Sequence, residues 1–63
     1  MKLQVRREAH GLTQEALGAR LNVTRSAVAM WEAGKAKPTA DKLITLAEIL
    51  ACTTDELLKE SEE

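Results

Sequence analysis

His10 and Cys52 are the only conventional candidates in this sequence for a nucleophile or a transition-metal ligand. A structural zinc site needs four ligands, so one histidine and one unpaired cysteine cannot supply it. No glycine-rich phosphate loop or pair of catalytic carboxylates is visible either. We therefore expect no enzyme activity, no metal and no cofactor. His10 is expected to close the first helix, and Cys52 to act as a small buried or half-buried apolar residue.

A different chemistry, hydrogen bonding to the edges of DNA bases, is available to a helix expected at about 24–33. At 100° per residue, Val28 and Trp31 lie on one side of that helix, which should face the core. The opposite side carries Arg25, Ser26, Ala29 and Met30. Arginine can donate two hydrogen bonds to guanine O6 and N7, methionine can meet a thymine methyl group, and small side chains let a helix lie deep in the groove.

Other polar groups are placed where they can bind phosphate. Gln14 and the free backbone N–H groups of a helix expected at about 13–21 form one such site, because a helix N-terminus attracts anions. Thr24 can share its hydroxyl between helix capping and a phosphate. Lys35 and Lys37 extend from the loop that follows the second of these helices.

Local signals define the two helices that position these residues. Thr13 and Thr24 are good N-caps for the expected helices at about 13–21 and 24–33. Asn22 lies where the chain must reverse, and asparagine is the non-glycine residue that best tolerates positive φ. Two short helices joined by a tight turn form a helix-turn-helix, the arrangement that places a helix in the DNA major groove.

Three further helices are expected around this pair. The first spans about 2–9 and ends before Gly11. Thr39 caps the fourth, and Thr53 begins a fifth through a capping box with Glu56. Apolar residues at helical spacing predict the buried faces, namely Leu17, Leu21, Leu43, Leu46, Ala47 and Leu50.

Length and charge limit the class of protein. The 63 residues suffice for one domain, which we take as 1–63, and the net charge is −1. Residues 1–38 carry seven basic and three acidic side chains, whereas residues 39–63 carry two basic and seven acidic ones. One end of the molecule is therefore expected to attract phosphate. Without a membrane span, a signal-peptide pattern or a disulfide, we expect a cytoplasmic protein that contacts no membrane.

These features together resemble the Cro/CI-type helix-turn-helix family of phage repressors and related bacterial regulators, over about residues 3–58. The resemblance is carried by Arg7, Gly11-Leu12-Thr13-Gln14, Leu17, Leu21, Val23-Thr24, Trp31-Glu32, Gly34-Lys35, Pro38, Leu43, Leu46, Ala47, Leu50, Asp55 and Leu57-Leu58. It implies an all-α fold, a compact five-helix lambda-repressor-like domain.

The resemblance also implies roles for individual residues. Arg7 would pair with Glu32 and link the first helix to the third, and Gln14 would contact a backbone phosphate. Arg25, Ser26 and Met30 would contact bases, while Lys35 and Lys37 would lie along the phosphate backbone.

Four positions depart from the family pattern. Gly18, which we expect to let the two helices approach closely, stands where alanine is usual, and Asn22 replaces the turn glycine. Met30 occupies a position where a polar side chain is common. Ala33 replaces a frequent asparagine, which removes one phosphate contact.

The sequence thus predicts a repressor-like transcriptional regulator that binds double-stranded DNA, either as a whole protein or as the DNA-binding part of a longer one. The alternative is an antitoxin or adaptor that binds another protein through its acidic C-terminal helices. No small-molecule ligand is evident. On DNA we expect a homodimer whose self-contact lies around Thr39 or within 52–58. Leu57 or Leu58 could form an apolar patch there, unless both close the core.

Overall fold

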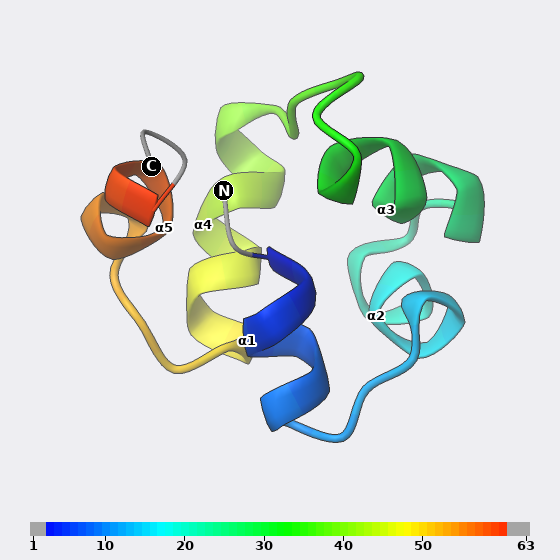
Figure 1. Ribbon diagram of the computed structural model, residues 1–63, viewed down its shortest axis with the longest axis horizontal. Coiled ribbons are helices and arrows are strands. Elements are labelled where there is room, and N and C mark those ends of the chain that lie inside the picture. Colours follow the sequence, from blue (N-terminus) through cyan, green and yellow to red (C-terminus); the bar gives the residue numbers. More distant parts are fainter. Residues whose placement is uncertain (1–2, 61–63) are drawn as a thin grey trace.

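The computed structural model describes the backbone of residues 3–60 and the side chains of residues 3–57, and all regular structure in this span is helical. The helices are α1 (Leu3–Ala9), α2 (Gln14–Leu21), α3 (Arg25–Glu32), α4 (Ala40–Ile49) and α5 (Thr54–Glu60). In Figure 1, α2 and α3 lie together on the right side of the molecule, α4 lies in the middle and α5 lies on the left side. The expected all-α fold is confirmed, with Lys2 outside the described residues.

Four threonines each precede one of the helices α2 to α5 and cap its N-terminus. The hydroxyl oxygen of each accepts a hydrogen bond from the backbone N–H three residues later, which satisfies one of the otherwise unpaired donors of the first helical turn. The pairs are Thr13 with Ala16 (3.0 Å), Thr24 with Ala27 (3.1 Å), Thr39 with Lys42 (3.4 Å) and Thr53 with Glu56 (3.1 Å). The helix starts predicted from these threonines are therefore confirmed.

The turn between α2 and α3 depends on Asn22 and Gly18. Asn22 has the predicted left-handed conformation, with φ at 58°. Gly18 is buried, and a Cβ atom at this position would lie 2.9 Å from the carbonyl oxygen of Val23 and 3.3 Å from the carbonyl carbon of Thr24. The close approach that glycine permits is therefore to the turn and the cap of α3, rather than to the body of α3.

A second non-glycine residue with positive φ, Ala51, was not predicted. It follows Leu50, the C-cap of α4, and its φ is 55°. The reversal lets the N–H of Cys52 donate a hydrogen bond to the carbonyl of Ala47 at 2.9 Å. Nothing in the residue type indicates this conformation, because alanine in the left-handed region is unfavourable by about 1–2 kcal/mol.

One apolar core joins all five helices. Its buried members are Leu3, Leu17, Leu21, Val28, Trp31, Leu46, Ala47, Leu50 and Leu57. Leu43, predicted to share this face, is half-buried and packs against the core. Leu57 is completely buried, so it closes the core, and the side chain of Leu58 lies outside the described residues. Among the described residues, no helix is both long and apolar enough to cross a membrane.

Two polar side chains add contacts at the ends of helices. His10 directly follows α1, and its ring Nε2 lies 3.0 Å from the carbonyl oxygen of Leu50, to which it donates. The ammonium group of Lys42, on α4, donates to the carbonyl oxygen of Leu21 at the end of α2, with a distance of 2.6 Å. Both contacts satisfy carbonyls that a helix end leaves without an intrahelical partner.

Candidate nucleic-acid interface

The predicted ion pair between α1 and α3 is present and buried. Arg7 donates from Nε to Glu32 Oε2 at 2.7 Å and from Nη2 to Glu32 Oε1 at 3.3 Å. Its Nη1 donates to the carbonyl oxygen of Leu12 at 2.7 Å. The two charged side chains are only 9% and 6% exposed. Arg7 thus links α1, the loop before α2 and α3 in one arrangement.

The ion pair with Glu32 also keeps the Arg7 guanidinium charged. The hydrogen bond to Glu32 raises the pKa of Arg7, against the opposing effect of burial, and the charges of Glu32 and Glu8 raise it further. The guanidinium is therefore a permanent cation, and its charge is compensated locally by the Glu32 carboxylate.

Gln14 joins this network from the first turn of α2. Its side-chain Nε2 donates to Glu32 Oε1 at 3.0 Å, so the Glu32 carboxylate accepts hydrogen bonds from two side chains on two different helices. Spacing along the sequence could not indicate this contact, because it depends on how α2 crosses α3. Both residues were singled out from the sequence, but for separate roles.

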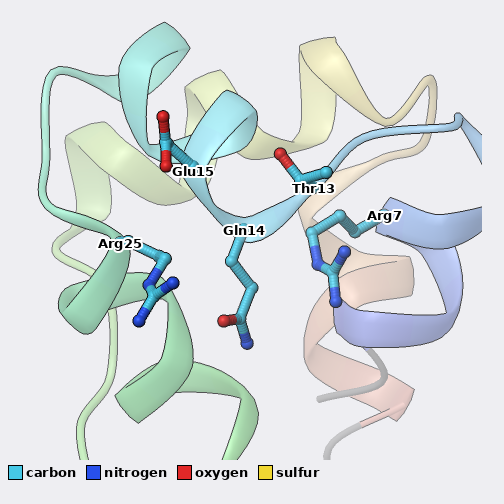
Figure 2. A pocket seen from close by; sticks show the side chains of 5 residues that line it. All are labelled: Arg7, Thr13, Gln14, Glu15 and Arg25. Atoms are coloured by element: carbon cyan, nitrogen blue, oxygen red, sulfur yellow. The ribbon is translucent and has the colours of Figure 1, made fainter.

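An open hollow lies beside the network, where α2 and α3 begin. It is lined by Arg7, Thr13, Gln14, Glu15 and Arg25. Figure 2 shows the Gln14 side chain between the two arginines, with Thr13 and Glu15 turned to the other side of the α2 backbone. Within the described part of the chain, the guanidinium of Arg25 has no acidic partner. The hollow therefore presents a cation beside an amide.

The two sides of α3 differ as the helical spacing predicted. Val28 is completely buried and Trp31 is 8% exposed. On the opposite side, Arg25 and Ser26 are exposed, Met30 is 45% exposed, and Ala29 is half-buried. None of these four residues is acidic, which suits insertion into a groove lined with hydrogen-bond acceptors.

The remaining predicted phosphate contacts lie at the two ends of α3. Thr24 is exposed at the beginning, where its hydroxyl caps the helix. Lys35 and Lys37 are exposed in the loop after the end, and the N–H of Lys35 donates to the carbonyl of Met30 at 2.9 Å. The structure thus brings Gln14 and Arg25 together in the hollow, whereas the two lysines lie beyond the opposite end of α3, a helix of eight residues that is about 12 Å long at 1.5 Å per residue.

Cys52 is half-buried against the core, as its type suggested. Among the described residues, no three His, Cys, Asp or Glu side chains lie together in a group that could hold a metal ion.

Comparison with known proteins gives a consistent match. The model of the helix-turn-helix family matches residues 3–57. The HTH-type transcriptional activator BcrR of Enterococcus faecalis is 41% identical over 61 residues, which are 97% of this chain and 30% of BcrR. Repressor protein C2 of Salmonella phage P22 is 33% identical over 58 residues, which are 92% of this chain and 27% of C2. The chain therefore spans less than a third of the length of either relative.

A solved structure agrees with these relatives. The NMR structure of the DNA-binding domain of the P22 C2 repressor superimposes with a TM-score of 0.84 at 33% sequence identity, covering 92% of this chain and 76% of that one. The family groups DNA-binding regulators and is not an enzyme class. By sequence and by fold, the chain belongs to the helix-turn-helix family of the Cro/CI type.

Proposed function

We propose that this chain binds double-stranded DNA in a sequence-specific manner and provides DNA recognition for a transcriptional regulator. The observation that carries the proposal is the exposed side of α3, on which Arg25 lies beside Gln14 while the opposite side is buried in the core. The relatives support it, since one is a transcriptional activator, another is a repressor, and the matching structure is a DNA-binding domain.

In this proposal α3 enters the major groove. Arg25 donates to guanine, while Ser26, Ala29 and Met30 allow close approach and contact neighbouring base edges or methyl groups. Phosphates on one side of the groove are bound by Gln14 and Thr24, and phosphates on the other side by Lys35 and Lys37. We propose that the interface works without a metal or a cofactor and that the protein binds DNA in the cytoplasm.

The charge distribution supports this orientation. Residues 1–38 have a basic excess and residues 39–63 an acidic excess, so the electrostatic field favours an approach in which α3 faces the duplex. The acidic α4 and α5 would be repelled from the phosphates and would remain outside.

We further propose that two copies bind one operator with two-fold symmetry. Recognition helices that enter successive major grooves lie about 34–36 Å apart. The molecule measures 24 × 23 × 21 Å, so two touching copies with α3 on their outer sides can span that distance. Since Leu57 is buried, the self-contact proposed here lies near Thr39, at the start of α4.

The test is selection from a pool of random duplexes by mobility shift, followed by sequencing of the bound fraction. A common motif containing a G·C pair, and weaker binding of single strands with the same sequence, would support the proposal. Equal binding of all duplexes, or no binding at salt below 100 mM, would overturn the proposal and favour the protein-binding alternative. Equal binding would count against it because weak, salt-dependent binding without sequence preference is typical of non-specific contacts, whose dissociation constants are about 10⁻⁴–10⁻⁶ M.

A further inference from the structure

The orientation of the Gln14 amide follows from its partner. A carboxylate can only accept hydrogen bonds, so the amide nitrogen, not the amide oxygen, must face Glu32 Oε1, 3.0 Å away. An amide nitrogen has two N–H groups, and one is used here. In the part of the chain that the structure describes, the second N–H and the amide oxygen have no hydrogen-bond partner. They belong to the side chain that lines the hollow beside Arg25.

Glu32 is itself held in place. Two hydrogen bonds from Arg7 fix its carboxylate, and the third guanidinium nitrogen is fixed by the carbonyl of Leu12. Both charged side chains are almost fully buried, so the carboxylate cannot turn toward solvent. Gln14 is therefore held by a rigid acceptor. Its long side chain is already ordered in the free protein, so DNA binding does not require that loss of conformational entropy again.

The electrostatics of the site point the same way. The negative charge of Glu32 is compensated by Arg7 within the network, so a phosphate near Gln14 does not face an uncompensated carboxylate. Arg25 supplies a positive charge on the same hollow. The remaining carboxylate, that of Glu15, is turned away from Gln14 and Arg25 in Figure 2.

We infer that Glu32 is a positioning residue for DNA binding: it holds the Gln14 amide so that the free N–H donates to a backbone phosphate beside Arg25. The inference rests on the proposed function. It assigns to the buried Arg7–Glu32 pair a role in affinity in addition to its role in stability.

A double-mutant cycle tests this role. The affinities of wild type, Gln14→Ala, Glu32→Gln and the double variant are measured for a duplex selected as above, at several salt concentrations and well below each melting temperature. Removal of a carboxylate near DNA should tighten binding by simple electrostatics. If Glu32 positions Gln14, the effect has the opposite sign, and Glu32→Gln should weaken binding about fivefold. This is less than the roughly tenfold change that corresponds to the loss of one hydrogen bond of about 1.4 kcal/mol.

Measuring Glu32→Gln in the Gln14→Ala background distinguishes two causes of weaker binding, namely loss of Gln14 positioning and damage to the fold. In that background Glu32→Gln should leave affinity unchanged or increase it, because no amide remains to be positioned. If Glu32→Gln weakens binding equally in both backgrounds, the inference is wrong and the loss reflects the fold. Gln14→Ala should leave the slope of log K against log salt unchanged, since a neutral amide releases no counterion. If the wild type binds no duplex, the proposed function itself fails.

A measurement on the free protein does not depend on whether Glu32→Gln folds. The NMR order parameter of the Gln14 side-chain amide should approach the value of about 0.85 found for rigid backbone. The control is Gln4, an exposed glutamine on α1 whose Nε2 lies 3.5 Å from Glu8 Oε2. Comparable mobility of the two amides would show that Glu32 does not fix Gln14.

Discussion

Arg7 and Glu32 are charges removed from water, so the contribution of each depends on the presence of the other. In Arg7→Ala, the Glu32 carboxylate, which is 6% exposed in the wild type, loses two hydrogen bonds and its compensating charge. Breaking a buried pair in this way costs about 3–5 kcal/mol, so we expect the free energy of unfolding in urea to fall by about that amount. The exposed Arg20→Ala on α2 is the control and should change stability by less than about 0.5 kcal/mol.

The raised pKa of Arg7 also predicts how this stabilisation depends on pH. A basic group whose pKa is higher in the folded state stabilises the fold at every pH below its unfolded pKa, and the effect disappears only as pH rises through the folded pKa. The difference in stability between wild type and Arg7→Ala should thus not decline between neutral and moderately alkaline pH. Equal stability of the two proteins at neutral pH would contradict a buried pair.

Arg25 is expected to determine sequence preference. On the proposed function, Arg25→Ala removes a bidentate contact to guanine and should reduce discrimination at one base pair by about 1–3 kcal/mol. The measurement is competition between the selected duplex and duplexes changed at single positions.

The matched comparison is with Lys35→Ala and Lys37→Ala, in the loop after α3. These variants should weaken binding to all duplexes alike, and each should reduce the salt slope by about 0.9. If Arg25→Ala also loses affinity uniformly, Arg25 contacts only phosphate.

At the residue scale, the sequence predicted the Arg7–Glu32 pair and the division of α3 into a buried and an exposed side. The pair followed from family resemblance, and the division followed from helical periodicity alone. The hydrogen bond from Gln14 to Glu32 was not predicted, because it is set by the crossing of α2 over α3.

The ends of the helices were mostly predictable, since capping depends on local residue type. Threonines at four N-caps and Asn22 in the turn have the conformations that their types favour. Ala51 is the exception: its left-handed conformation belongs to the hydrogen-bonded turn that ends α4, a position where glycine is usual, so its residue type gave no signal. The contacts of His10 with Leu50 and of Lys42 with Leu21 could not be predicted either, because they require the packed helices.

Ala51 therefore offers a direct test at the scale of an element. Glycine has no steric penalty at positive φ, so Ala51→Gly should remove about 1–2 kcal/mol of backbone strain from the folded state. The more flexible unfolded chain offsets this gain by about 0.4–1 kcal/mol. We expect a net gain in stability of about 0.5–1 kcal/mol by thermal unfolding. Ala19→Gly, at an exposed position within α2, is the control and should instead destabilise by about 1 kcal/mol. Destabilisation by both substitutions would show that Ala51 is not left-handed.

The whole molecule combines a basic part, which carries the proposed DNA-binding surface, with an acidic part. The basic part is committed to DNA in this proposal, and a self-contact confined to the residues around Thr39 would be small, so it should be weak without DNA. We expect cooperative binding to a palindromic duplex, with higher affinity per protomer than for an isolated half-site. Equal affinity per protomer and no cooperativity would mean that the chain binds as a monomer.

If α3 and the hollow beside it form the DNA-binding surface, as we propose, NMR chemical-shift mapping will locate the bound DNA there. When the selected duplex is added to the labelled protein, backbone amide resonances of α3, of residues 13–15 and of residues 34–38 should shift, while those of α5 should remain in place. A duplex of scrambled sequence should give smaller shifts over the same surface. Largest shifts in α4 and α5, with α3 unaffected, would contradict the claim.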